Sequence, residues 1–199
     1  MKTANGLAAR LDRSRSGGRP STELVGLLAG RLHVLDCALD GLSAGDPYEL
    51  VLGVGSQEAD PSFADLLAEM YEAWAAARGM QLGRLTPGPG HHVLAVSGLG
   101  CWQILHGEAG LHVLEHAADD DGRSAERETA RVTVAPRSTK PTPEGEAGDE
   151  ARLALAAVAA PNVVVRRYRS GPSPLVRDSA RGYRTGNLDQ VLAGEFDLY

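Results

Sequence analysis

Apolar residues recur at three- and four-residue steps along one segment of the chain, a spacing that is typical of an amphipathic helix with one buried face. The segment follows Asp60, a good N-cap residue, and Pro61, whose backbone angle suits the first helical position. It ends at Gly79, which can adopt the left-handed conformation that terminates helices. We expect Trp74, its largest apolar side chain, to be buried. The apolar stripe comprises Phe63, Leu66, Leu67, Met70, Tyr71 and Trp74.

A second, leucine-rich stripe predicts an N-terminal helix over Ser21–Asp40 that ends at Gly41. Ser21 and Thr22 are available to cap its first turn. Its leucines lie approximately on one side of the helix: Leu24, Leu27, Leu28, Leu32, Leu35 and Leu39.

Short segments with β-branched or alternating apolar residues predict strands, and turns rich in glycine and proline separate them. The expected strands are 48–54, 81–85, 91–96, 111–116, 129–134 and 163–168. Further short helices are expected over 98–107, 152–160 and 186–194. The polar run 119–122 predicts the tip of a hairpin, and 136–150, with almost no apolar residues, predicts a flexible linker. These elements together predict an α+β fold.

Length and charge divide the chain into two parts. Residues 21–199 are enough for a single domain with one core. Residues 1–20 hold five basic residues against Asp12 alone, which predicts a disordered basic arm; an organelle transit peptide is the alternative interpretation. The net charge of −6 disfavours indiscriminate nucleic-acid binding.

Two further features of composition bear on location. No apolar run approaches the roughly 20 residues that span a bilayer, so we expect no membrane contact. Cys37 and Cys101 are far apart and form no disulfide framework, which favours a reducing, cytoplasmic location.

The first strand and the long helix together resemble the codon-reading domain of bacterial and organellar class I peptide chain release factors. Those proteins have a strand ending in a Gly-rich turn with GG-(T/D)-E-A, then a helix with MY..(W/Y)A..(R/K)G. Here residues 50–59 read LVLGVGSQEA, and residues 70–79 read MYEAWAAARG, in matching order and spacing. The resemblance makes Gly55 and Glu58 structural motif residues. For Glu58, the alternative is a carboxylate in the first helical turn that interacts favourably with the helix dipole.

Two more blocks carry the same resemblance. Residues 106–112, HGEAGLH, are similar to the family's E-x-G-V-H-R, which makes Glu108, Gly110 and His112 motif residues. Near the C-terminus, the family's IR-(S/T)-Y, R-(V/I)-x-D-x-R-T-G and VL-x-G-x-L-D are resembled by residues 166–168, 176–186 and 191–198. The resemblance implies an α/β sandwich like the family's codon-reading superdomain, with an N-terminal helix, and a role in translation termination on the ribosome.

The hydrolytic part of the family is missing. Release factors hydrolyse peptidyl-tRNA with a separate domain whose Gly-Gly-Gln loop lies at the ester. Its place here is the segment 134–163, and no Gly-Gly-Gln occurs in the sequence. Hydrolysis needs preorganised donors and a positioned water, and the near match RSGPSP at 169–174 has no glutamine, while its Pro172 has no N–H to donate. We therefore expect no enzyme activity and no cofactor, which leaves room for a separate catalytic partner protein.

The stop-codon loop also departs from the family. Val113 and His116 stand where the family has basic residues. The loop equivalent consists of Ala118, Asp119, Asp120, Asp121, Gly122 and Arg123. Because three adjacent carboxylates repel RNA phosphates, we do not expect this loop to read a stop codon as the family does.

Arginines near the C-terminus are the best folded candidates for contacts with ribosomal RNA. Six arginines between residues 166 and 184 stand against four later or intervening acids. The candidate RNA-binding residues are Arg166, Arg167, Arg177, Arg181 and Arg184. The alternative is an internal ion-pair network with Asp178, Asp189, Glu195 and Asp197.

Three hypotheses follow. The first is a release-factor-like protein that binds at or near the ribosomal A site and has no hydrolytic centre. The second is a regulatory or structural protein that kept the fold but no longer binds the ribosome. The third is a small metal-dependent enzyme; its ligand types are present in Cys101, His106, His112 and His116, but their spacing is not that of a recognised metal site, and we expect no metal.

Overall fold

The computed structural model describes residues 6, 9, 22–86, 88–116, 126–137 and 146–199. Most of the expected basic arm, the hairpin tip with the whole decoding-loop equivalent 118–123, and most of the expected linker lie outside these residues. Within them, no helix is both long enough and apolar enough to cross a membrane.

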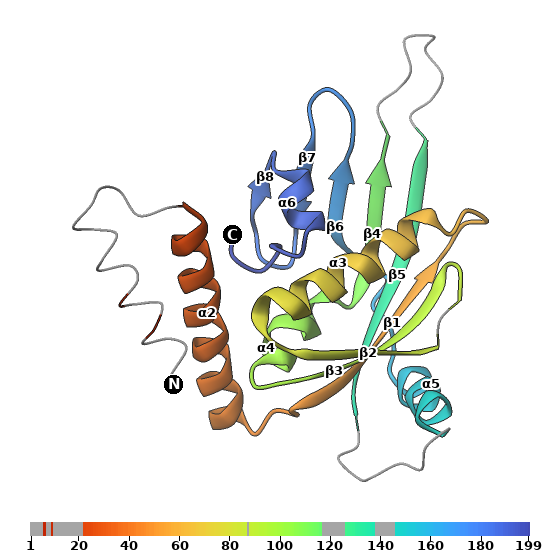
Figure 1. The fold of residues 1–199 in the computed structure, drawn as a ribbon. Helices are drawn as coiled ribbons and strands as arrows, with labels where there is room; N and C mark the ends of the chain where they lie inside the picture. The colour runs from red at the N-terminus through yellow and green to blue at the C-terminus, as the bar shows by residue number, and fades with distance from the viewer. Residues whose placement is uncertain (1–5, 7–8, 10–21, 87, 117–125, 138–145) are drawn as a thin grey trace.

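The described strands form one eight-stranded sheet in the order β2-β3-β1-β5-β4-β6-β7-β8 (Figure 1). All neighbours are antiparallel except β4 and β6, which are parallel. The strands are β1 (Glu49–Ser56), β2 (Gln81–Thr86), β3 (His91–Ser97), β4 (Gly110–Glu115), β5 (Arg127–Pro136), β6 (Val164–Arg169), β7 (Leu175–Asp178) and β8 (Arg184–Thr185). The six predicted strands are all present, with ends shifted by a few residues, and the α+β prediction is confirmed.

Helix α3 (Ser62–Arg78) lies across one face of the sheet and forms the main core with it (Figure 1). Trp74 is fully buried, as its place in the apolar stripe predicts. Both ends of the helix follow the sequence signals. The Asp60 carboxylate accepts a hydrogen bond of 2.9 Å from the Ser62 amide, and Gly79 adopts the left-handed conformation.

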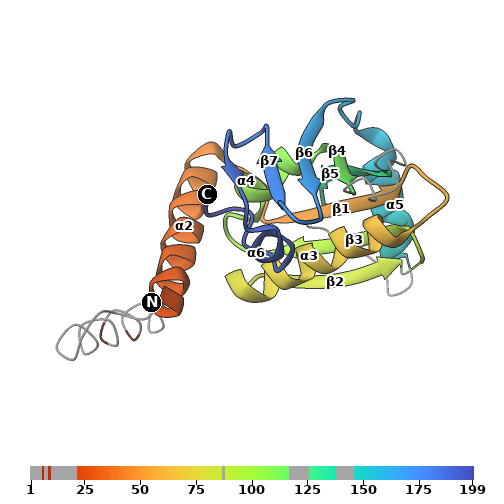
Figure 2. The ribbon, with the colours of Figure 1, turned by 90° about the horizontal axis from the view of Figure 1, so that it is seen from above.

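Helix α2 (Thr22–Ala44) stands at one end of the molecule (Figures 1 and 2). The predicted end at Gly41 is wrong, because the helix continues for three more residues. Gly41 is a buried position inside the helix, where a Cβ would lie at an ordinary contact distance of 3.5 Å from Asp46 and Gln103. The first positive φ comes at Gly45, and the Asp46 amide donates back to the Gly41 carbonyl at 2.9 Å.

Helix α5 (Ala147–Ala157) packs against the opposite face of the sheet, where Val51, Ala135 and Ala151 form a second small core. Its approach is close: a Cβ on Gly53 of β1 would lie 2.9 Å from Leu155 Cδ1. The linker prediction over 136–150 is therefore wrong at both ends. Pro136 is the last residue of β5, and residues 147–150 form the first turn of α5.

Three short helical elements complete the part of the fold that the structure describes. They are α4 (Cys101–Leu105), the 3-10 helix η1 (His106–Glu108) and α6 (Leu188–Leu192). η1 positions Glu108 directly before β4, and α6 lies beside α3 near the C-terminus (Figure 2).

Candidate nucleic-acid interface

Residues from all three sequence blocks meet in one buried hydrogen-bonded cluster. The Arg166 Nη2 atom of β6 donates to Glu108 Oε1 at 2.7 Å and to Asp178 Oδ2 of β7 at 2.7 Å. Tyr71 of α3 donates its hydroxyl to Glu108 Oε2 at 2.9 Å. Arg181 donates to both carboxylates as well. We call these five residues, Tyr71, Glu108, Arg166, Asp178 and Arg181, the Glu108 network.

The network keeps the Glu108 carboxylate ionised inside the protein. Glu108, Arg166 and Asp178 are at most 1% exposed. Burial alone would raise the pKa of Glu108, but the positive charges of Arg166 and Arg181 outweigh it and lower this pKa to about 2. Because every charge has a bonded opposite charge, the cluster links η1, β6, β7 and α3 without leaving an uncompensated ion.

His112 of β4 lies next to this network as a neutral imidazole. Its Nε2 is 3.1 Å from the Glu108 carbonyl oxygen and its Nδ1 is 3.2 Å from the Tyr168 hydroxyl. A ring that donates from Nε2 and accepts at Nδ1 satisfies both contacts, since Arg166 Nη1 already donates to Tyr168 Oη at 3.1 Å. Complete burial lowers the pKa of His112 to about 4, and Arg166 adds to this while Glu108 opposes it.

We expect acid to destabilise the fold through His112. Below the ordinary histidine pKa of 6.5, the unfolded chain takes up a proton that the folded His112 does not. The contribution of His112 to stability is therefore fully present above pH 6.5 and is lost as the pH falls to about 4. The expected loss is on the order of 3 kcal/mol. Glu108 adds a further loss between its ordinary pKa of 4.5 and about 2. Urea unfolding at a series of pH values measures the profile.

Two variants isolate the contribution of His112. His112→Gln keeps one donor and one acceptor but cannot titrate, so its stability should vary less between pH 6.5 and pH 4. His106→Gln changes an exposed histidine and should leave the profile of the wild type unchanged. Equal slopes in the wild type and His112→Gln would contradict this assignment.

The buried cluster corrects the RNA-binding prediction at two positions. Arg166 has no exposed surface, and Arg181 bonds both carboxylates and the Ile104 carbonyl oxygen, at 2.6 Å, so neither is free to contact RNA. The alternative of an internal ion-pair network describes these two arginines correctly, with Asp178 as one acid. Asp197 instead pairs with Arg78 of α3, at 2.6 Å.

The remaining three predicted arginines form a row on the outer face of the sheet. Arg167 of β6 lies directly opposite Arg177 of β7, and Arg177 lies directly opposite Arg184 of β8. Residues opposite one another on neighbouring strands share a face, with Cβ atoms about 5 Å apart. Because Arg166 points into the core, its neighbour Arg167 points away from it. We call Arg167, Arg177 and Arg184 the arginine row.

The arginine row has little internal charge compensation. Arg167 Nη1 pairs with Glu115 Oε1 at 3.2 Å in a half-exposed bridge. Within the part of the chain that the structure describes, Arg177 and Arg184 are exposed, and their guanidinium groups have no hydrogen-bonded or ion-paired partner. Like charges opposite one another destabilise a sheet unless counter-charges neutralise them. Beside the row, a cavity of about 180 Å³ is lined by Glu115, Arg167, Arg169, Leu175 and Arg177, together with Tyr168. This surface is suited to an anionic ligand such as a phosphodiester chain.

The turn before α3 is held by a residue that the sequence did not single out. Ser56 Oγ accepts from the Glu58 amide at 3.1 Å and lies 2.9 Å from the Asp60 carbonyl, to which it donates. Glu58 itself is exposed and lies before the helix, so the interpretation as a first-turn carboxylate is wrong. Gly55 is an ordinary β1 position above the His91 ring. A serine among Gly, Gln and Glu gives no pattern that identifies it in advance.

Gly110 is required where β4 begins. Its φ is 145°, and a Cβ there would lie 2.6 Å from the Val163 carbonyl oxygen, which already accepts a hydrogen bond from the Leu111 amide. The glycine thus lets β4 and the entry to β6 approach closely enough to place Glu108 beside Arg166.

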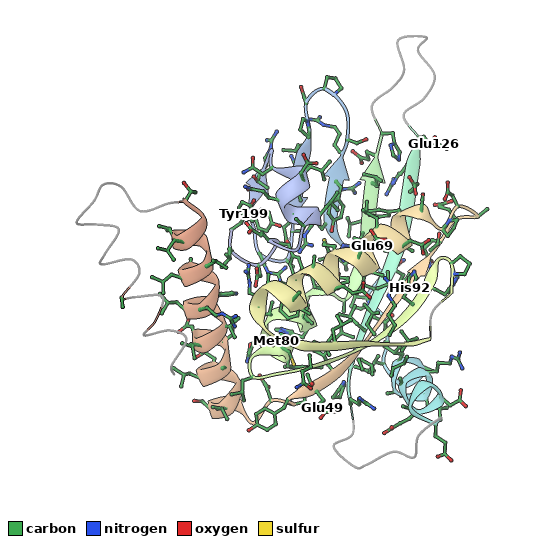
Figure 3. All side chains as sticks on the ribbon, in the orientation of Figure 1. Glu49, Glu69, Met80, His92, Glu126 and Tyr199 are labelled. Carbon is green, nitrogen blue, oxygen red and sulfur yellow. The ribbon has the colours of Figure 1, made fainter. Side chains whose placement is uncertain are left out.

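The four residues considered for a metal site do not come together. No group of three or more potential ligands is present among the described residues. Cys101 is buried with its thiol directed at the Tyr48 carbonyl, whereas His106 is exposed. The His116 ring lies 2.7 Å from the Glu128 carboxylate on the neighbouring strand β5. Glu126, labelled in Figure 3, is the residue before β5.

Comparison with known proteins gives a likeness in structure and none in sequence. No family model matches the chain, and no curated protein matches its sequence. Among solved structures, RF2 of Thermus thermophilus matches with a TM-score of 0.55 and 18% identity, over 98% of this chain and 80% of that one. The chain therefore has a release-factor-like fold.

Proposed function

We propose that this protein is release-factor-like in function as well as in fold, binds at or near the ribosomal A site, and does not itself hydrolyse peptidyl-tRNA. The observation that carries the proposal is the Glu108 network. Tyr71, Glu108 and Arg166 come from three separate sequence blocks that resemble release factors, and they bond to one another. If the three motifs resembled release factors only by chance, there would be no reason for their residues to contact one another in the fold.

The arginine row is the proposed RNA contact. Its unpaired charges lie on a face that α3 leaves free, and phosphate groups would supply the counter-charge that Arg177 and Arg184 lack among the described residues. A protein with this role acts where ribosomes are, which is the basis for proposing a cytoplasmic location.

The segment between β5 and β6 supports the absence of hydrolysis. Where release factors insert their catalytic domain, this chain has α5, which packs on the sheet through Ala151 and Leu155. We propose that the protein either competes with true release factors or works with a separate catalytic partner.

Co-sedimentation with purified ribosomes tests the binding proposal. The double variant Arg177→Glu/Arg184→Glu should weaken binding by about tenfold or more, and it should lower the dependence of log affinity on log salt by about two. Arg152→Glu reverses an exposed arginine on α5, 60% exposed in its side chain, and serves as the matched control. If the wild type does not sediment with ribosomes, the proposal fails and the interaction-protein alternative takes its place.

The second expectation is catalytic silence. With ribosomes that carry peptidyl-tRNA and any stop codon in the A site, we expect no ester hydrolysis above the spontaneous rate, because the chain has no Gly-Gly-Gln loop. A true release factor in the same assay gives the positive control. Release by this chain at a comparable rate would contradict the expectation.

A further inference from the structure

Helix α2 exposes a continuous row of large apolar side chains. Val25, Leu32, Leu35, Leu39 and Leu42 are each between 45% and 65% exposed. Figure 3 shows side chains of α2 projecting on the side away from the sheet. With the half-buried Leu28, they form what we call the leucine seam: Val25, Leu28, Leu32, Leu35, Leu39 and Leu42.

The seam is separate from the face by which α2 holds its own domain. That face includes Val34 and Cys37, which pack against the main core, and three small residues: Ala38 and Gly41 lie near α4, and Gly30 contacts the Arg78 guanidinium. A Cβ on Gly100 would lie 3.0 Å from the Ala38 amide nitrogen, so the helix is already in close contact there. The leucine face predicted for this helix is therefore mostly exposed to solvent. Of its six leucines, only Leu24 is buried, with 8% of its surface exposed.

The spacing of the seam is that of a coiled coil. Successive members are separated by three, four, three, four and three residues, which places them at the a and d positions of consecutive heptads. None of these a and d positions holds a polar residue. This stripe lies on a different side of α2 from Gly30 and Ala38, which contact the protein's own domain, so packing within that domain does not account for it.

The exposed area is large enough for a pair of such helices to associate. The seam exposes on the order of 500 Å² of apolar surface, at the upper end of what monomeric proteins usually leave uncovered. Two copies together would bury about 1,000 Å², the area at which specific interfaces begin.

We propose that two copies of this chain associate through the leucine seam of α2. Identical seams are self-complementary in a two-fold dimer, in which each helix presents the same apolar face to the other. Arg31, beside the seam, turns toward its own domain and donates to the Arg78 carbonyl at 3.0 Å, so its charge is not directed at a partner helix. The proposal goes beyond the ribosome-binding function and does not depend on it.

Sedimentation velocity on the full chain, from about 1 to about 100 µM, tests the proposal. The wild type should reach a mass of twice 20.9 kDa as concentration rises. Leu35→Glu/Leu39→Glu should raise the dissociation constant at least about 100-fold, because each carboxylate would be buried in the seam. Leu153→Glu, at a 72% exposed leucine of α5, is the matched control and should dimerise like the wild type.

Two results would overturn the proposal. One is a wild type that stays monomeric over the whole concentration range. If such a protein dimerises only after residues 1–20 are removed, the occupant of the seam is the chain's own N-terminal segment and not a second copy. The other is a Leu35→Glu/Leu39→Glu variant that dimerises like the wild type. Thermal melting checks that this variant is folded, and Val25→Glu/Leu42→Glu, at the two ends of the seam, provides an independent second variant.

Discussion

Replacing Arg166 with methionine is expected to lower the free energy of unfolding by about 3–5 kcal/mol. Arg166 donates to Glu108 and to Asp178, and all three side chains are fully buried. Without the guanidinium, two carboxylates remain in the interior, and Arg181 is the only cation among the described residues that still bonds to them. Urea unfolding followed by tryptophan fluorescence at neutral pH measures the change, with Trp74 as a buried reporter.

A cycle of variants separates charge pairing from packing. Adding Glu108→Gln to Arg166→Met removes one uncompensated charge, so the double variant should be less destabilised than the sum of the single variants. Arg177→Met alters the exposed arginine on the neighbouring strand and should cost no more than about 0.5 kcal/mol. A cost below about 1 kcal/mol for Arg166→Met would mean that the network does not stabilise the fold.

Arg166 and Arg167 show which features of the site can be predicted from the sequence and which cannot. Tyr168 is the large aromatic residue of the predicted strand 163–168 and is buried in the structure, and side chains alternate along a strand. Arg166, two residues earlier, therefore belongs to the inner face and Arg167 to the outer face. That alternation was available from sequence. The acids that neutralise Arg166 were not, because Glu108 is 58 residues away and only the fold brings it within 2.7 Å.

Glycine was not a reliable signal for the end of a helix. Gly79 and Gly41 both follow a periodic apolar stripe, and both were expected to end a helix. Gly79 does so, whereas Gly41 lies inside α2. Propensity alone does not distinguish the two positions, because a glycine inside a helix costs only about 1 kcal/mol, which tertiary packing can override.

The last two strands could not be predicted for a different reason. β7 is four residues long and β8 is two, and both are rich in polar residues. Neither contains an alternating apolar run long enough to indicate a strand. Asp178 of β7 is bonded to Arg166, and Arg184 of β8 pairs in register with Arg177. Tertiary contacts thus define the strands that carry most of the arginine row.

Replacing Trp74 with alanine is expected to cost about 3–5 kcal/mol of stability, which is a large share for a domain of this size. The indole packs against Phe196, with ring centroids 6.0 Å apart, and donates from Nε1 to Asp197 Oδ2 at 2.9 Å. Its loss would leave a cavity and remove one of the donors of a buried carboxylate that Arg78 also binds. Thermal and urea unfolding measure the cost.

Two further variants test the same contact from both sides. Trp74→Phe keeps much of the volume and loses the hydrogen bond, so its cost should be clearly smaller than that of Trp74→Ala. Gly194→Ala acts from the C-terminal segment: Gly194 has φ of 93°, and a Cβ there would lie 2.7 Å from Trp74 Cα. The added methyl group must push this segment away from α3, so Gly194→Ala should also destabilise the protein. If Trp74→Ala costs less than about 1 kcal/mol, the face of α3 that holds the C-terminal segment is not the one assigned here.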